Sequence, residues 1–180
     1  MITQVRLCAT HRYRVRHDPL IRFEPGVNAV VGPNGTGKTT VLRAVHGCDR
    51  CAVETRGEAR RIFVSSAQAN PRSEGYRQHC LLDSLLRTRA LFSSHGEIMR
   101  EVLGTLPLGR GDTLLIDEPE AGQDLDWVER LRVGFDQICR TLNLQIIMAT
   151  HHPVFWHHCH VIELVPGYTE EARRSFRRYL

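Results

Sequence analysis

Hydrophobic and polar positions along the chain follow two periods, which predicts strands that alternate with helices. Three short runs, VNAVV, TLLID and QIIMA, are almost continuously apolar, as expected of strands that are covered on both faces of a sheet. Other short apolar stretches are bounded by polar or turn-forming residues and predict further strands. The predicted strands are Ile2–Cys8, Leu20–Phe23, Val27–Val31, Ile62–Ser66, Thr113–Asp117, Gln145–Ala149 and His160–Leu164.

Segments between these strands have the three-to-four-residue spacing of amphipathic helices. The alternation of buried strands with helices predicts one α/β domain over residues 1–180, with a mostly parallel sheet and flanking helices. The predicted helices are Lys38–Val45, Leu81–Leu91, Glu97–Leu103, Trp127–Leu142 and a C-terminal helix that Thr169 caps.

Composition narrows the class of protein. The chain has 180 residues, of which 42% are hydrophobic and 24% charged, as in ordinary soluble domains. No apolar run approaches the roughly 18 residues of a membrane span, and the N-terminus lacks the apolar core of a signal peptide. We therefore expect a cytoplasmic protein without membrane insertion, whose six cysteines are reduced. A net charge of +4 permits contact with nucleic acid without arguing for it.

The stretch GPNGTGKT matches the phosphate-binding pattern GxxxxGK[ST] and stands between a predicted strand and a predicted helix. Its glycines let backbone N–H groups turn toward an anion. Lys38 is the only lysine of the chain, and a flexible ammonium reaches phosphates that a rigid guanidinium fork does not. We expect Thr39 to bind Mg²⁺ as well. The nucleotide-binding residues predicted here are Gly32, Asn34, Gly35, Thr36, Gly37, Lys38, Thr39 and Thr40.

Acidic residues follow the buried run TLLID. Asp117 ends that strand, so it would lie beside the phosphate-binding loop and hold Mg²⁺. The next residue, Glu118, could act as the general base that activates a water. Acids at a strand end also cap turns, and the nearby phosphate-binding loop favours the catalytic interpretation.

A histidine follows the buried run QIIMA. His151 emerges at the same predicted sheet edge, where a neutral imidazole could bond the γ-phosphate or the attacking water. Its neighbour His152 is interpreted as an ordinary polar side chain. Lys38, Glu118 and His151 are thus the predicted catalytic residues.

The order of GPNGTGKTT, LLIDEPE and ATHH resembles the ATP-binding-cassette (ABC) ATPase superfamily, and most of all its soluble branch of RecF-like and structural-maintenance-of-chromosomes proteins. The resemblance covers roughly residues 20 to 165. It implies a P-loop fold of ABC type, with ATP and Mg²⁺ bound and ATP hydrolysed.

Further residues are assigned by this resemblance alone. Gln68 corresponds to the glutamine that contacts Mg²⁺, and Tyr13 to an aromatic that stacks on adenine. FSSHGE corresponds to the signature loop, with Ser94 and Gly96 in contact with the nucleotide of the opposite subunit. Asp124 corresponds to the aspartate of the dimer-contacting loop. The family therefore implies an ATP-dependent homodimer.

The segment of about residues 69–104 would form a very short helical lobe, with no recognisable transporter dock and no coiled-coil heptads. We expect the ATPase to act on a soluble protein partner, in DNA repair or defence. Two alternatives stay open: a binding switch that is gated by ATP without hydrolysis, and the energy subunit of a transporter. Glu118 favours an enzyme over a switch, and the short lobe weighs against a transporter.

Two other patterns have competing interpretations. Cys48-x-x-Cys51 and the run HHCH at 157–160 could contribute to a zinc site, which needs about four ligands. We favour loop cysteines and surface histidines, and expect no stoichiometric metal other than Mg²⁺. The arginine-rich runs RYRVRH and RRSFRRYL fit solvated segments better than a nucleic-acid interface, which stays open.

Overall fold

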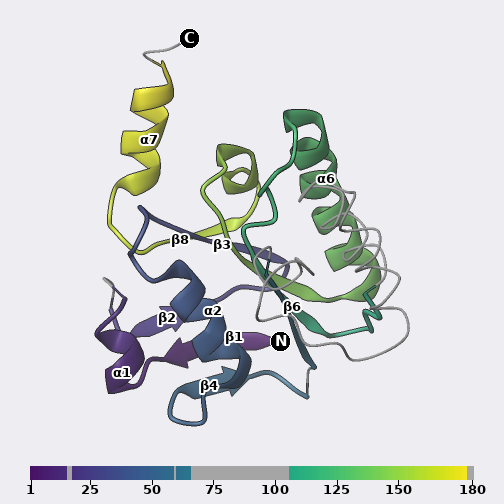
Figure 1. Ribbon diagram of the computed structural model, residues 1–180. Coiled ribbons are helices and arrows are strands. Elements are labelled where there is room, and N and C mark those ends of the chain that lie inside the picture. Colours follow the sequence, from purple (N-terminus) through teal and green to yellow (C-terminus); the bar gives the residue numbers. More distant parts are fainter. Residues whose placement is uncertain (16–17, 59, 66–105, 178–180) are drawn as a thin grey trace, which may run out of the picture.

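The computed structural model describes residues 1–15, 18–58, 60–65 and 106–177, arranged as two sheets with helices around them (Figure 1). The predicted helices Leu81–Leu91 and Glu97–Leu103, and with them the predicted helical lobe, lie outside the described residues. None of the described helices combines the length and the apolar composition that crossing a bilayer requires.

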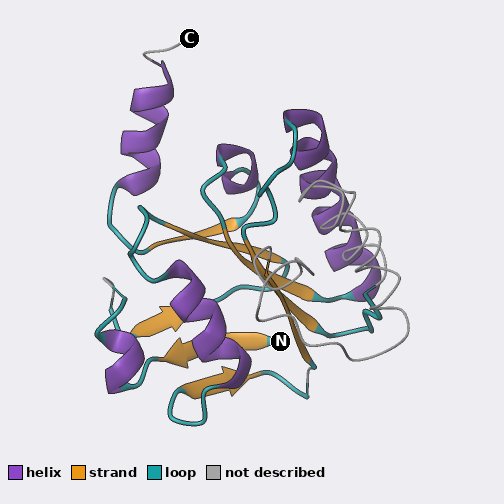
Figure 2. Ribbon diagram, in the orientation of Figure 1, coloured by secondary structure: helices purple, strands orange, loops and turns teal. Residues whose placement is uncertain are grey.

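The larger sheet is fully parallel, which confirms the predicted α/β class (Figure 2). Asp117 pairs with Ala149, and Ala149 pairs with Val30, so the carboxyl ends of the three central strands meet at one edge. The strands, in spatial order, are β5 (Arg61–Ser65), β6 (Thr113–Asp117), β7 (Gln145–Ala149), β3 (Val27–Val31) and β8 (His160–Glu163).

The smaller sheet is antiparallel and has the order β2 (Leu20–Arg22), β1 (Ile2–Arg6), β4 (Ala52–Thr55). Strand β4 was not predicted, because most of its side chains are exposed and its sequence AVET lacks a clear apolar period. The predicted first strand was too long. The chain leaves the sheet after Arg6, and Cys8 precedes the short helix α1 (Ala9–Arg12).

Buried side chains form two cores, one on each face of the parallel sheet. Alternate residues of a strand point to opposite faces, which explains why the runs VNAVV and QIIMA are almost continuously apolar. Helix α2 (Lys38–Gly47) shares one core with both sheets, while α6 (Leu125–Leu142) and the 3-10 helix η1 (Pro153–Trp156) cover the other face. Along β3, for example, Val30 belongs to the first core and Ala29 and Val31 to the second.

Two helix starts differ from the prediction. Helix α6 begins at Leu125, because Asp124 caps it by accepting a 2.8 Å hydrogen bond from the Trp127 backbone N–H. Helix α7 (Tyr168–Arg177) projects from the body (Figure 1), and Thr169 lies inside it and does not cap it. The Glu163 carboxylate at the end of β8 accepts from the Gly167 and Thr169 backbone N–H groups at 2.7 and 2.9 Å and serves as the cap.

A single buried glutamine links the two sheets. Gln145 is fully buried at the start of β7, and its Nε2 donates to the backbone carbonyls of Ile2 and Glu24, both at 2.8 Å. Its Oε1 accepts from the Ile2 backbone N–H at 2.8 Å and from the Thr113 hydroxyl at 3.3 Å. Every hydrogen-bonding group of the amide is therefore used.

Replacing this amide by an apolar group should destabilise the fold markedly. We expect Gln145→Leu to lower the free energy of unfolding by about 2–4 kcal/mol, because several buried polar groups would lose their partner. Urea unfolding followed by circular dichroism measures it. Gln137→Leu, on the exposed face of α6, is the control and should change the stability by less than about 0.5 kcal/mol. Equal effects of the two substitutions would contradict the linking role.

Candidate functional site

The loop from Gly32 to Gly37 joins β3 to the N-terminus of α2, as predicted. Gly37 has a φ of 96° and stands immediately before the helix. A Cβ at this position would lie 2.6 Å from the Arg14 carbonyl oxygen, so a side chain has no room here. The loop is therefore packed against the segment that carries Arg14, with its backbone held in a conformation that favours glycine.

The ammonium group of Lys38 folds back over this loop. Its Nζ donates to the carbonyls of Gly32 at 2.9 Å and Pro33 at 3.1 Å, and the residue is only 7% exposed. Burial lowers the pKa of Lys38, while the charges of Glu118 and Asp117 oppose that shift. A buried cation thus stands at the loop with acids close by.

Thr39 and Asp117, both predicted Mg²⁺ ligands, are in direct contact. The Thr39 hydroxyl donates to Asp117 Oδ1 at 3.0 Å, which joins the first turn of α2 to the end of β6. Burial raises the pKa of Asp117, and the hydrogen bond from Thr39 works against that shift. The third predicted ligand, Gln68, lies outside the described residues.

Glu118 follows β6 in an unusual backbone conformation. Its φ is 53°, in the left-handed region that side chains rarely adopt. The backbone N–H of Glu118 donates to the Ala149 carbonyl at 2.9 Å, which ties it to the end of β7. Backbone strain of this kind is concentrated at functional sites, and the side chain borders the cleft that the phosphate-binding loop forms.

Glu120 was missed by the sequence analysis, although it is the second glutamate of DEPE. Its Oε1 accepts from the Thr150 hydroxyl at 2.8 Å and from the His151 backbone N–H at 2.7 Å. The carboxylate therefore clamps the turn after β6 to the residues that follow β7. Glu120 thus positions the backbone of His151. The second glutamate of DEPE was the sequence signal that could have identified this residue.

The surroundings of His151 favour the neutral form of its imidazole. Its Nε2 is buried and makes no hydrogen bond to the described part of the chain. Burial lowers the pKa of His151, the charge of Lys38 lowers it further, and Glu120 and Glu118 oppose the shift. An imidazole of this kind can donate to or accept from a ligand at neutral pH.

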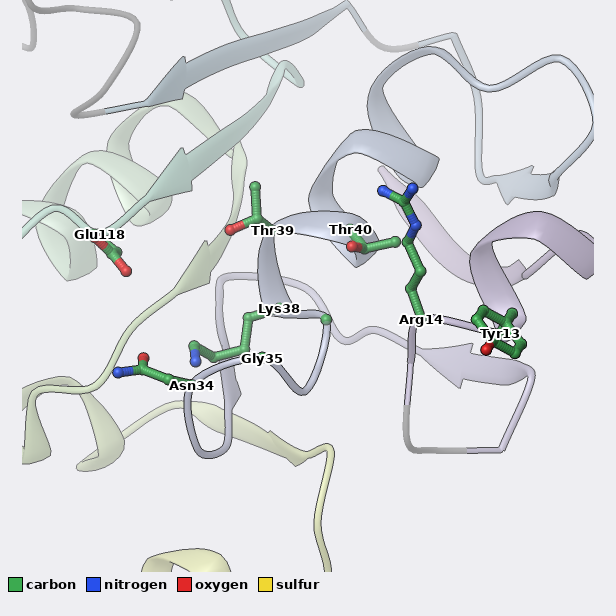
Figure 3. Close-up of a pocket in the computed structure, with 9 residues that line it drawn as sticks. Tyr13, Arg14, Asn34, Gly35, Lys38, Thr39, Thr40 and Glu118 are labelled. Atoms are coloured by element: carbon green, nitrogen blue, oxygen red, sulfur yellow. The ribbon is translucent and has the colours of Figure 1, made fainter.

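A cleft of about 630 Å³ opens beside the loop. Figure 3 shows Tyr13 and Arg14 at one end of it and Glu118 at the other. Tyr13 is 93% exposed there. The lining residues are Tyr13, Arg14, Asn34, Gly35, Gly37, Lys38, Thr39, Thr40 and Glu118.

Other predicted residues do not line this cleft. Thr36 is a buried residue of the loop, and its hydroxyl donates to the Pro33 carbonyl at 2.8 Å. Gly32 contributes a carbonyl that Lys38 contacts. Asp124 caps α6. The predicted signature residues Ser94 and Gly96 lie outside the described residues. The structure thus unites the loop, Asp117, Glu118 and His151 and leaves the family-derived dimer contacts as predictions.

The charge of Lys38 should be measurable at His151. We expect a ring titration by NMR to give His151 a pKa below the ordinary 6.5, and Lys38→Ala to raise it because a nearby positive charge is lost. As the pH falls, the His151 imidazole is protonated at a higher pH in the unfolded chain than in the folded one. The lowered pKa therefore destabilises the fold below about pH 6.5. Lys38→Arg keeps the charge and serves as the control, and His151→Gln assigns the signal. An unchanged His151 pKa in Lys38→Ala would contradict the coupling.

Known proteins resemble this chain in part of its sequence and in its fold. Residues 5–48, which run from β1 through the phosphate-binding loop to the end of α2, match the family model described as an AAA domain. A metal-chelate type ABC transporter, solved in an inward-facing conformation, is 17% identical with a TM-score of 0.50, over 80% of this chain and 71% of that one.

A second solved structure is the ATP-binding cassette MJ0796, a dimer in a post-hydrolysis state bound to ADP and Pi. It is 14% identical with a TM-score of 0.51, and the similarity covers 80% of this chain and 83% of that one. The parallel sheet, the loop before α2 and these neighbours agree on one conclusion: the chain has the fold of the ABC-type P-loop ATPases.

Proposed function

We propose that the chain binds ATP and hydrolyses it in the cleft beside the phosphate-binding loop. The observation that carries this proposal is the 3.0 Å hydrogen bond between the Thr39 hydroxyl and Asp117. It joins residues 78 positions apart, so that a hydroxyl, a carboxylate and the buried ammonium of Lys38 belong to one site. The cleft volume of about 630 Å³ lies within the range of small-molecule sites.

The phosphates would bind at the loop. Lys38 now donates to two backbone carbonyls, and phosphate oxygens offer its ammonium stronger, charge-assisted acceptors. The N-terminus of α2 adds backbone N–H groups and a partial positive charge. At the other end of the cleft, the exposed ring of Tyr13 is available to stack on adenine.

A magnesium ion fits the residues beside the loop, because Mg²⁺ prefers oxygen ligands and usually keeps several waters. Thr39 and Asp117 would hold it, together with Gln68. When bound, Mg²⁺ neutralises charge on the β- and γ-phosphates.

Glu118 is the proposed general base. It would take the proton of the attacking water while the water oxygen bonds to the γ-phosphorus and ADP leaves. The bond of its backbone to Ala149 holds the residue at the end of the sheet. His151, with an unbonded and buried Nε2, would contact the γ-phosphate or the water and is oriented by Glu120.

We further propose that the active unit is an ATP-dependent homodimer. A cleft open to solvent gives little preorganisation to the charge that develops during transfer. Ser94 and Gly96 of a second subunit would cover the γ-phosphate, and Asp124 would lie near that interface. The cytoplasmic location, the soluble partner and a role in DNA repair or defence rest on the sequence resemblance alone.

The roles of Lys38 and Glu118 can be separated by two substitutions. Lys38→Ala should weaken ATP binding at least about tenfold, because a charge-assisted contact is lost. Glu118→Gln should bind ATP as before and lower turnover by about 10²–10⁴-fold. A fluorescent ATP analogue and a phosphate-release assay measure the two effects. Glu129→Gln, on the exposed face of α6, is the control and should behave like the unmodified chain.

Two results would overturn parts of this assignment. Undiminished turnover in Glu118→Gln would remove Glu118 as the base. An unmodified chain that binds ATP without any turnover would be a binding switch rather than an ATPase.

The dimer has a test of its own. ATP should convert Glu118→Gln from monomer to dimer, and Ser94→Arg should block that conversion while leaving ATP binding intact. A mixture of Ser94→Arg with Lys38→Ala should recover part of the ATPase rate, because each mixed dimer has one intact site. Sedimentation velocity and rates across a mixing series decide the matter. If Ser94→Arg dimerises and turns over normally, FSSHGE is not the signature loop.

A further inference from the structure

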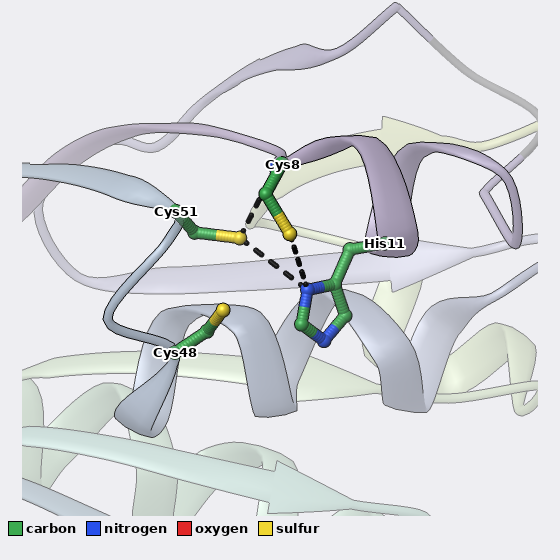
Figure 4. Close-up of side chains that lie close together, drawn as sticks. All are labelled: Cys8, His11, Cys48 and Cys51. Atoms are coloured by element: carbon green, nitrogen blue, oxygen red, sulfur yellow. Dashed lines mark hydrogen bonds between the residues drawn. The ribbon is translucent and has the colours of Figure 1, made fainter.

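Three cysteines and one histidine converge at the end of α2 that lies away from the phosphate-binding loop. The ligand atoms of Cys8, His11, Cys48 and Cys51 all lie within 4.8 Å of one another. Figure 4 shows the three thiols gathered around the imidazole, whose Nδ1 is 3.1 Å from the Cys8 sulfur and 3.4 Å from the Cys51 sulfur.

Two chain turns that are far apart in sequence supply the ligands in pairs. Cys8 and His11 come from the junction of β1 with α1, and two residues lie between them. Cys48 ends α2, and Cys51 directly precedes β4. Short x₂ spacings of this kind are typical of zinc-binding turns.

The sequence analysis favoured loop cysteines and surface histidines over a zinc site, and the structure adds ligands that it did not consider. The sequence analysis paired Cys48 and Cys51 only with the histidines and cysteine at 157–160, none of which belongs to the cluster. The residues that share the cluster with Cys48 and Cys51 are Cys8 and His11. Their relation to Cys48 and Cys51 depends on the pairing of β1 with β4, a strand that the sequence did not predict.

We propose that these four residues bind a structural zinc ion. Three thiolates and one imidazole are a common ligand set of structural zinc, with Zn–S and Zn–N distances of about 2.3 and 2.0 Å. Ligand atoms around such an ion are separated from one another by roughly 3.5–3.8 Å. The two sulfur–Nδ1 distances here are 3.1 and 3.4 Å, and all four ligand atoms lie within 4.8 Å of one another, so small side-chain movements would bring them to an ion. All four positions come from the protein, so no position is left for a substrate.

Backbone hydrogen bonds hold the sulfur atoms of the two turns in place. The backbone N–H of Cys8 donates to the Cys51 sulfur at 3.3 Å, and hydrogen bonds to ligating groups orient them and tune the metal. The Cys51 backbone N–H in turn donates to the Cys48 carbonyl at 3.2 Å, which closes the turn between the two cysteines. Sulfur and nitrogen donors exclude Mg²⁺ and Ca²⁺, which prefer oxygen.

The position of the site indicates what the ion does. It would connect His11 of α1 to Cys51, which lies 40 positions later in the chain, between α2 and β4. Tyr13 and Arg14 follow α1 immediately and line the cleft. The zinc ion would thus brace the small sheet and the segment that borders the cleft, and its loss should reduce stability.

Elemental analysis of the full chain, purified under reducing conditions without chelator, tests the proposal. We expect about one zinc per chain, and at least about a tenfold lower content in Cys8→Ser and in Cys48→Ser. Cys159→Ser is the matched control, because Cys159 is another partly buried cysteine outside the cluster and a hydroxyl can keep its bond to the Phe155 carbonyl. Removing the zinc from the unmodified chain should lower its melting temperature by more than about 5 °C.

Cobalt makes the test independent of variants that fail to fold. Co²⁺ offered to the zinc-depleted, unmodified chain should give the d–d bands of a tetrahedral ion and a thiolate charge-transfer band. The proposal is overturned if neither zinc nor Co²⁺ binds to the reduced chain, if Cys159→Ser loses zinc as Cys8→Ser does, or if Cys48 and Cys51 form a disulfide in a metal-free native protein.

Discussion

The burial of helix α2 between two sheets is the constraint on which the rest of the structure depends. Val41, Leu42, Ala44 and Val45 have no exposed surface, and each buried valine or leucine side chain contributes roughly 1.5–3 kcal/mol. The helix cannot shift without disturbing both sheets. Its N-terminus therefore holds the phosphate-binding loop at a fixed place, and its C-terminus brings Cys48 to the cysteine–histidine cluster.

The second constraint is that parallel strands end at one edge, where the acids of β6 and the residues after β7 meet the loop. These groups are buried together, so their pKa values move in the directions that favour neutral forms: Lys38 and His151 downward and Asp117 upward. A bound polyphosphate with its cation would oppose the shifts at Lys38 and Asp117.

Much of this arrangement could be predicted from the sequence because local patterns carry it. The apolar runs predicted the strands of the parallel sheet, and their order predicted that Asp117 and His151 would meet the loop of Lys38. The small sheet could not be predicted in full, since β4 has mostly exposed side chains and gains its place only by pairing with β1. For the same reason the cysteine–histidine cluster was missed, and the role of Glu120 appears only when two strand ends are side by side.

Because Lys38 is the only lysine, a chain labelled with ¹³C at the lysine ε-carbon gives one side-chain signal from the proposed phosphate site. The pH titration of that signal tests the central claim most directly. In the free chain the pKa of Lys38 should lie below the ordinary 10.5, and ATP with Mg²⁺ should raise it, whereas AMP, which lacks the β- and γ-phosphates, should not. An identical response to ATP and AMP, or no response to either, would contradict the assignment of Lys38 to the β- and γ-phosphates.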